Sequence, residues 1–418
     1  MSRLERFILV GLVLLVVLAG FTVAVAPRLR QREEGQRSAG QDDPVPSDRP
    51  LEPGETETMS ARVIEVLEEG TVELGEGITQ PYQRLLLLVE SGSMAGQELV
   101  VEEGTVNVIS QERLFDPGDR VYVERTFGID GDRFYVSDFV RTPSLFLIAG
   151  LFMALVVLAG RGKGVRSLGG TLFSLVVIFA FVVPQIVAGR DPVFVSIVGS
   201  VVLLAVSNYL IYGWNPRAHA AVGGMVVSLT LTGVLAWLVV GWARLTGLTA
   251  EESSYLLMEL GPGVNLQGLL LGGIIIGSMG ALDDICVSQV SVVFELADAD
   301  PGMPWSELFR RSFNVGQDHI AAMVNTLVLA YTGASLPLIL AFSLYREPLW
   351  RRLNREPIAE EIVRTLVGSI GLILAAPITS LIASLVVHWI ARRERTKNAG
   401  ARIASPITDE RVRRANEE

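Results

Sequence analysis

Long apolar stretches constrain this chain most, because two consecutive ones carry ionisable side chains. The first, residues 266–294, contains Asp283 and Asp284 near its middle, and the second, residues 318–344, opens on Asp318. An Asp at the centre of a membrane helix costs about 2.5 to 3.5 kcal/mol on translocon scales. Two adjacent carboxylates therefore require a protein interior, a polar partner or water. We take these two segments as the candidate site.

Helical periodicity predicts which faces of the two segments meet. Small and polar residues of the first segment recur at helical spacing and share one face: Gly273, Gly277, Gly280 and Asp284. Polar residues of the second segment share a face in the same way: Asp318, Asn325 and Thr332. Paired glycines let a neighbouring helix approach closely. We expect the two faces to pack together, with Asp284 at the interface and Asp283 turned toward another span or a water-filled pocket.

The depth of the acidic pair in the bilayer has two interpretations. Residues 268–294 would extend about 40 Å as a helix, at 1.5 Å per residue. This exceeds the hydrocarbon thickness of about 30 Å. A centred span places both Asp residues near the midplane, whereas a shorter span places them at the water interface.

Composition identifies the class of protein. Half of the 418 residues are hydrophobic, and the mean hydropathy is +0.43, which is typical of a polytopic membrane protein. The net charge of −10 comes largely from an acid excess in residues 33–119 and argues against a nucleic-acid partner. With one cysteine, Cys286, the chain cannot form an intrachain disulfide, and its three histidines lack zinc-ligand spacing. We expect no metal and no cofactor.

The fold class predicted is a mainly α-helical polytopic membrane protein with a small exported all-β domain. About eight transmembrane helices are expected: 7–26, 143–160, 167–188, 192–213, 219–245, 266–294, 318–344 and 361–391. The domain division expected is a transmembrane anchor or signal at 1–27, a linker at 28–57, a β-domain at 58–141, a membrane domain at 143–392 and a charged cytoplasmic tail at 393–418. Basic residues flank the spans on both sides, so the positive-inside rule is nearly balanced. The export signal decides the orientation, with both termini cytoplasmic.

The β-domain is predicted from five short segments with strand character between residues 58 and 141. Asp130-Gly131 is a hairpin turn signal between the last two of them. The number and length of these strands favour an OB-like barrel or a sandwich. The acidic surface lacks the basic groove of a nucleic-acid OB-fold. A structural cap and a domain that captures an exported partner both remain open.

The spacing of polar residues resembles that of a known family. The stretch from Gly280 to Leu340 resembles the YibE/F-like family of bacterial integral membrane proteins, and the resemblance extends over residues 143–392. Its signature corresponds to Gly280–Asp284, Ser288–Gln289, Phe309–Arg311, Asp318–His319 and Asn325–Thr326. The resemblance implies several spans and a location in the plasma membrane of a bacterium, but no particular activity. A more distant one is to half of a resistance-nodulation-division protein such as SecD or SecF, although this chain has two more predicted spans and no duplicated half.

The function expected is a transporter or permease component for a small solute or ion, coupled to protons or cations. Its expected site residues are Asp283, Asp284, Ser288, Gln289, Asp318, His319 and Asn325, with Gly273, Gly277 and Gly280 as packing residues. Asp283 or Asp284 would bind the coupling ion, Asp318 and His319 would serve the cytoplasmic entry, and Asn325 would bridge the helices. Alternatively, Asp318 caps a helix and Asn325 only packs. Expected partners are the lipid bilayer and the solute, with a second copy or an exported protein as further candidates. The alternative functions are a membrane-anchored scaffold and, less favoured, an intramembrane aspartyl hydrolase.

Overall fold

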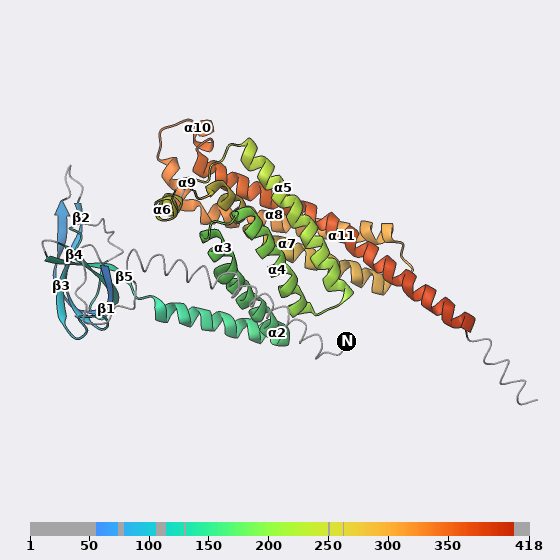
Figure 1. Ribbon diagram of the computed structural model, residues 1–418, viewed down its shortest axis with the longest axis horizontal. Coiled ribbons are helices and arrows are strands. Elements are labelled where there is room, and N and C mark those ends of the chain that lie inside the picture. The colour runs from blue at the N-terminus through green and yellow to red at the C-terminus, as the bar shows by residue number, and fades with distance from the viewer. Residues whose placement is uncertain are drawn as a thin grey trace, which may run out of the picture. The chain divides into compact units, whose positions relative to one another are not determined.

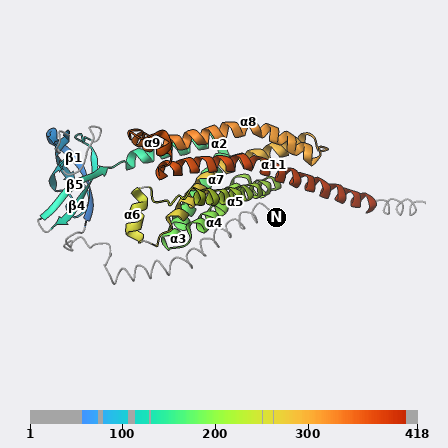
Figure 2. The ribbon, with the colours of Figure 1, turned by 90° about the horizontal axis from the view of Figure 1, so that it is seen from above.

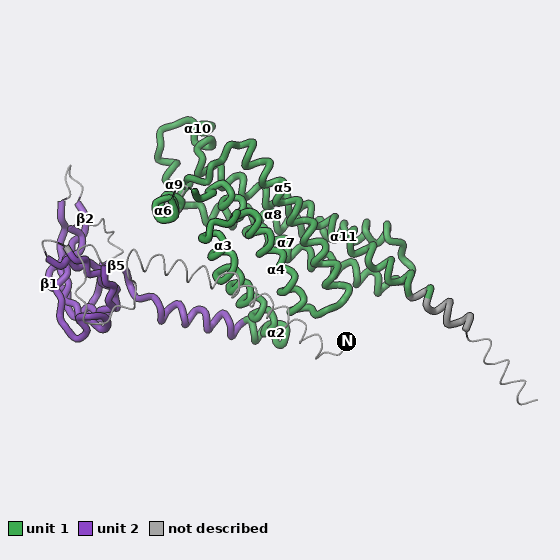
Figure 3. The backbone as a smooth tube through the Cα atoms, viewed as in Figure 1, with its two compact units in different colours: residues 1–18, 156–418 green, residues 19–155 purple. Residues whose placement is uncertain are grey.

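The structure is a computed structural model that describes residues 56–73, 79–105, 114–128, 131–249, 251–261 and 263–404. The chain divides into two units, with the boundary between Leu155 and Val156 (Figure 3). The predicted anchor at 7–26 lies outside the described residues. The predicted tail from residue 393 is helical up to Ala404, and its remainder also lies outside them.

The strands of the unit drawn purple in Figure 3 form one antiparallel sheet with the order β3-β2-β1-β4-β5. The bounds are β1 Thr56–Glu73, β2 Thr79–Val89, β3 Glu98–Glu103, β4 Arg120–Gly128 and β5 Gly131–Phe139. β1 alternates apolar and polar residues, so that Met59, Ala61 and Val63 point into the core. Register shifts after Val63 and Val66 bend this strand. The five predicted strands are those found in the described part of the unit.

The sheet curves into a half-barrel whose two edge strands approach each other. Glu103 on β3 is 4% exposed, and its Oε1 accepts a hydrogen bond from the backbone N–H of Val136 on β5 at 2.6 Å. Inside the curve, Gln83 exchanges two hydrogen bonds with the backbone of Phe115, at 2.8 and 3.1 Å. The described strands thus confirm a small β-sheet unit, whereas the finer prediction of an OB-like barrel is not confirmed.

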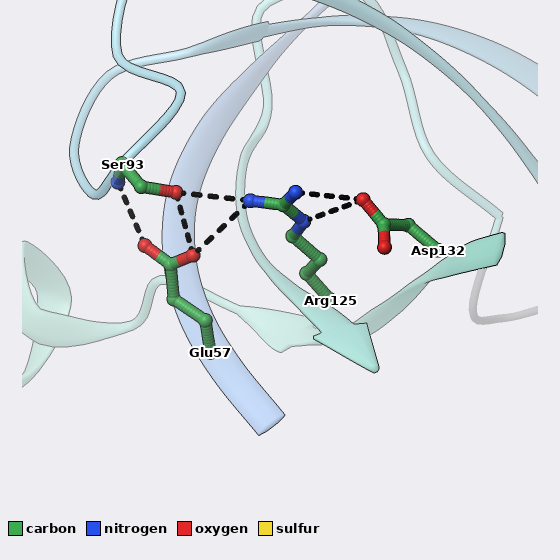
Figure 4. A network of polar contacts seen from close by, with 4 residues as sticks. All are labelled: Glu57, Ser93, Arg125 and Asp132. Carbon is green, nitrogen blue, oxygen red and sulfur yellow. Dashed lines mark hydrogen bonds and ion pairs between the residues drawn. The ribbon is translucent and has the colours of Figure 1, made fainter. Parts of the chain in front are cut away.

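A charged network fastens the loop after β2 to the sheet (Figure 4). Glu57 accepts hydrogen bonds from the backbone N–H and the hydroxyl of Ser93, at 2.7 and 2.6 Å. Arg125 donates to Asp132 at 2.6 Å and to the Ser93 hydroxyl at 3.2 Å, and it lies 3.7 Å from Glu57. Both carboxylates and the guanidinium therefore have partners, which is expected of a network that holds a fold together.

Helices make up the rest of the described chain (Figure 1). Their bounds are α2 Thr142–Val177, η2 Ile178–Val182 (a π-helix), α3 Val183–Val187, α4 Pro192–Tyr212, α5 Pro216–Trp242, α6 Glu251–Leu260, α7 Leu266–Ala299, α8 Trp305–Ala334, α9 Leu336–Ser343, α10 Leu349–Leu353 and α11 Glu356–Ala404. Side chains of Asp191, Asn215 and Asn265 cap α4, α5 and α7.

Five described helical stretches are long and apolar enough to cross a membrane: Thr142–Val187, Pro192–Tyr212, Pro216–Trp242, Leu266–Ala299 and Glu356–Arg393. The pair α8 and α9 makes a sixth if it counts as one span. The prediction of eight spans is therefore not confirmed. The first stretch joins the predicted spans 143–160 and 167–188, and it is interrupted at Arg161, whose φ of 47° and ψ of −130° are not helical.

The core of the helical unit forms where α5, α7 and α11 meet, with α4 and α8 packed against them. α8 and α11 run side by side in both Figure 1 and Figure 2. Close approach depends on glycine at two crossings. A Cβ on Gly224 of α5 would lie 2.5 Å from the Thr379 hydroxyl of α11, and one on Gly316 of α8 would clash with the Gln289 amide of α7. Polar side chains of the central helices are thereby held against their neighbours.

Candidate functional site

The carboxylate of Asp283 lies between α7 and α4, where it accepts a hydrogen bond from Nδ2 of Asn208 at 2.7 Å. Asn208 is 1% exposed, and Nδ2 also donates to the carbonyl of Leu204 at 3.1 Å. Its Oδ1 is buried and has no hydrogen-bond partner in the described part of the chain. The Asp283 carboxylate and the unpaired amide oxygen of Asn208 lie on neighbouring helices and can together bind a proton or a small cation.

Asp283 and Asn208 occupy different positions along their own helices. Asp283 is near the middle of α7, but Asn208 lies about one turn before α4 ends at Tyr212. Beyond that end, Arg217 at the start of α5 forms ion pairs with Glu295 and Asp298. Asp283 therefore lies toward the end of the core where α4 ends and α5 begins, although it is midway along α7 itself.

The two adjacent Asp residues are in different environments. Asp283 is turned toward another span, α4, as expected, whereas Asp284 is not buried at an interface with α8. Asp284 is exposed, as are Gly273, Gly277 and Gly280 of the predicted face, whereas Asp283 is half-buried and paired. Of these glycines, Gly277 lies opposite α8, where an added Cβ would be 3.1 Å from the Tyr331 hydroxyl. Adjacent helical residues point about 100° apart, so burying Asp283 turns Asp284 outward.

The buried polar face of α7 continues from Asp283 through Cys286 and Gln289. Cys286 Sγ accepts a hydrogen bond from the Thr379 hydroxyl at 3.1 Å. Gln289 is 1% exposed, and its Oε1 accepts one from the Ser380 hydroxyl at 2.9 Å. These contacts join α7 to α11, so the sequence-predicted Gln289 lies in the core. The predicted Ser288 lies between these core residues and is half-buried.

The polar residues predicted on the second segment are not brought to the Asp pair. Asp318, His319 and Asn325 are all exposed on α8. Asp318 does not cap the helix either, because α8 already begins at Trp305, with Pro304 at its N-cap. The face of α8 that packs inward carries Leu308, Ser312 and Gly316 instead.

The predicted span 318–344 is broken where α8 meets α9. The two helices differ in direction by 61°. At the break the Ser335 hydroxyl donates to Glu361 of α11 at 2.8 Å, and Glu361 is also paired with Arg364 at 2.7 Å. A cavity of about 250 Å³ lies here, lined mainly by apolar side chains together with the hydroxyl-bearing Tyr331 and Thr365.

A second cavity, of about 460 Å³, lies where the end of α7 meets the start of α8 and the later part of α11. Trp305 and Leu308 contribute apolar surface to its wall, and His388 and Arg392 contribute ionisable groups. Asp283 does not line either cavity. Among the described residues, no group of three or more His, Cys, Asp or Glu side chains could hold a metal ion.

Sequence reasoning missed several polar residues of the core. Asn208, Thr379, Ser380 and Glu361 are not among the site residues expected from the sequence. An isolated Asn in an apolar span is a usable signal, because it needs a polar partner there. Ser and Thr in a membrane helix usually bond to their own backbone, so their pairing across helices leaves no distinct pattern.

The comparison with protein families identifies the helical unit. A family model described as YibE/F-like protein matches residues 148–389, more than half of the chain. The chain belongs to the YibE/F-like family. No curated protein and no solved structure matches it. The matched region of this YibE/F-like protein contains the Asp283–Asn208 pair, and its apolar helices are those of a membrane protein.

Proposed function

We propose that this YibE/F-like protein is a membrane transport component that moves a small solute or ion and is coupled to protons or cations through Asp283. The observation that carries the proposal is the Asp283–Asn208 pair between α7 and α4. An ionisable residue within membrane helices is costly and usually serves an ion pathway. Asp283 would bind the coupling ion, while the amide of Asn208 fixes the carboxylate and offers its own unpaired oxygen.

The broken helix α8–α9 supports transport rather than simple anchoring. Non-helical backbone at membrane depth is tolerated where protein covers it or where it lines a cavity. Discontinuous helices of this kind form the substrate sites of many transporters. Here the break at Ser335 borders the 250 Å³ cavity and is fixed to α11 through Glu361. We assign the solute to this cavity and the coupling ion to Asp283.

The test is a flux measurement on the full-length protein in liposomes that contain a pH-sensitive dye. A panel of small solutes is added outside, and solute-dependent pH changes inside are recorded. Asp283→Asn keeps the size and the hydrogen-bonding shape but removes the charge, and it should abolish the coupled pH change. Asp284→Asn is the matched control and should retain it, because Asp284 is exposed and has a different environment. Equal flux in the two variants would refute the role of Asp283.

The location and orientation are part of the same proposal. We place the protein in the plasma membrane of a bacterium, with both termini cytoplasmic and residues 58–141 outside. The helix directions support a chain that crosses the membrane in alternate directions. α7 runs parallel to α4, two spans earlier, because Gly272 lies against Ser196 and Asp283 lies against Asn208. The strand order and the approach of β3 to β5 support the further proposal that the exported sheet is OB-like.

One observation favours a scaffold as the second candidate function. Asp318, His319 and Asn325 are exposed on α8, which passes for a span only together with α9. Polar side chains in such a position are stabilised by a partner helix or by a second copy of the chain. Replacing all three by alanine should disrupt an assembly without affecting flux if the scaffold function is separate.

A further inference from the structure

A second carboxylate, Glu360 in the second turn of α11, is more deeply buried than Asp283. Glu360 is 7% exposed, and its Oε2 accepts a hydrogen bond from the Thr249 hydroxyl at 2.7 Å. Its Oε1 is buried and has no hydrogen-bond partner among the described residues. A single unpaired oxygen on a buried carboxylate is costly unless it receives a ligand.

The surroundings of Glu360 are built by contacts on both sides. The segment after α5 is fastened to α11, since the backbone N–H of Thr246 donates to Glu356. It is also fastened to α7, because Gln267 Nε2 donates to the carbonyl of Leu245 at 2.7 Å. Leu245 is 3% exposed and belongs to an apolar cluster with Leu270 of α7 and Val367 of α11. Thr249 is thereby held over Glu360, beside apolar side chains.

Neighbouring charges leave Glu360 without an ion pair. Glu356, one turn earlier, accepts from Thr246. Arg364, one turn later, is paired with Glu361 at 2.7 Å. Arg244, in the segment after α5, is exposed. Glu360 therefore forms no ion pair within the described part of the chain.

The ligand that fits this site is a proton. Ca²⁺ takes six to eight oxygen ligands, and Mg²⁺ demands octahedral coordination, whereas Glu360 offers one free oxygen beside a single hydroxyl. No cluster of three or more acidic, His or Cys side chains occurs among the described residues. A proton on Oε1 converts the carboxylate into a neutral acid and so removes the buried charge, while Thr249 continues to donate to Oε2.

Glu360 and Asp283 lie toward opposite ends of the same helical core. Thr379, which contacts Cys286 next to Asp283, is about 28 Å beyond Glu360 along α11, at 1.5 Å per residue. This is close to the hydrocarbon thickness of about 30 Å. Buried hydroxyls of Thr232, Ser278 and Ser369 lie on the core helices between these levels.

We infer that Glu360 binds a proton at the end of the core remote from Asp283. The proton reaches Glu360 from the side on which the segment after α5 lies. The inference rests on the proposed coupling function for its role in transport, but proton binding at Glu360 is a separate property. The step is balanced without a co-reactant, because one proton from water joins Oε1 and leaves from the same atom.

The test uses the full-length protein in nanodiscs, titrated with acid and followed by the infrared carbonyl band of protonated carboxyl groups. The probe is the proton itself. Glu360→Gln should remove one carboxyl equivalent from the band that grows on acidification. Glu361→Gln is the matched control, since Glu361 is the adjacent carboxylate but is already bonded to Ser335 and Arg364, and the Glu360 contribution should persist in it. Thr249→Val should shift the frequency of that contribution, because Oε2 loses its donor.

Two outcomes would overturn the inference. The first is a band identical in the native protein and in Glu360→Gln, with the variant eluting as a folded protein. The second is a Thr249→Val spectrum with no shift. If Glu360→Gln removes the band while Asp283→Asn leaves flux intact, proton binding stands and the proposed function fails. If Asp283→Asn abolishes flux and Glu360→Gln changes neither flux nor band, the function stands and this inference fails.

Discussion

The charged network of the sheet and the polar groups of the helical core satisfy their hydrogen bonds to different degrees. Arg125 contacts Asp132, Ser93 and Glu57, and each carboxylate in that network has a donor. In the helical core, Oδ1 of Asn208 and Oε1 of Glu360 are buried without a partner in the part of the chain that the structure describes. The acceptors of Asn208 and Glu360 thus differ from the carboxylates of the charged network, each of which has a donor.

This difference separates polar groups that hold a fold from those that can take up a ligand. A fully paired network rigidifies its surroundings, and the sheet network fastens the loop after β2. A buried acceptor without a donor destabilises the folded state by roughly 1–3 kcal/mol. Its persistence beside an apolar cluster is explained when a proton or a cation occupies it.

The largest effect should come from a bulky side chain placed where α5 and α11 cross. Gly224→Leu inserts a side chain where even a Cβ would lie 2.5 Å from Thr379. Overpacking usually costs about 1–3 kcal/mol and sometimes more, and a backbone crossing cannot relax easily. We expect loss of the folded protein, measured as a lower thermal midpoint in size-exclusion assays. Gly280→Leu is the control, because a Cβ added there would meet no neighbouring atom within 4 Å, and this variant should retain the native midpoint.

The second effect tests the sheet network. Arg125→Met removes the cation that lies between Glu57 and Asp132, whose side chains are 20% and 32% exposed. Glu57 keeps its two hydrogen bonds from Ser93 but loses the nearby cation, and Asp132 loses its Arg125 donors. This should cost about 1–3 kcal/mol, seen as faster hydrogen exchange in β4 and β5. Arg84→Met removes an exposed arginine 3.8 Å from Glu102 and should change exchange little. Equal protection in the two variants would contradict the structural role of the network.

The third effect compares two buried hydroxyls of the helical unit. Ser380 donates to Gln289, so Ser380→Ala should cost about 1 kcal/mol. Ser200 is fully buried and its Oγ has no partner among the described residues. Ser200→Ala should therefore be neutral or slightly stabilising. Thermal midpoints of the two variants in the same detergent measure the difference, and a larger loss for Ser200→Ala would sink the distinction.

The smallest effect is a pH shift in the sheet. Tyr135 donates to Glu124 at 2.5 Å, and this hydrogen bond raises the pKa of Tyr135 above its ordinary value of 10.0. The folded state thus favours the neutral phenol. Its stabilising contribution is complete below the unfolded pKa and is lost as the pH rises through the folded pKa. Phenolate absorbance, with Tyr135→Phe to assign the signal, should show earlier ionisation in Glu124→Gln. Unchanged ionisation in that variant would show that Glu124 is not the cause.

Sequence reasoning located the acidic helix and expected Asp283 to face another span, but it assigned the packed face to the wrong side of the helix. The glycine face containing Asp284 was expected inside, because paired glycines often mark a helix interface. The structure exposes this face and buries the one with Asp283, Cys286 and Gln289. Burying Asp283 instead of Asp284 requires a rotation of α7 about its axis by one residue, about 100°. Because a membrane helix has apolar residues on all sides, its sequence does not determine that rotation.

The strands were predictable, whereas the partners in the core were not. Alternation along β1 and β4 follows directly from a sheet with one buried face, so the sequence indicates these strands. The partners of Asp283 and Glu360 are Asn208 and Thr249, which are remote in sequence. Such pairs follow from helix packing, which a single sequence does not encode as a pattern. Pro337 in the predicted span 318–344 indicates a kink, but not the bend of 61° between α8 and α9.

The position of Cys286 has a practical consequence for spectroscopy. It is the single cysteine of the 418-residue chain, and it is 0% exposed, with the Thr379 hydroxyl against its sulfur. A bulky maleimide or spin label has no access to that sulfur while the helices stay packed. Cysteines introduced in pairs on the surface would then be the reactive thiols of the folded chain. Distances between spin labels across the α8–α9 break could be measured without first removing the native thiol.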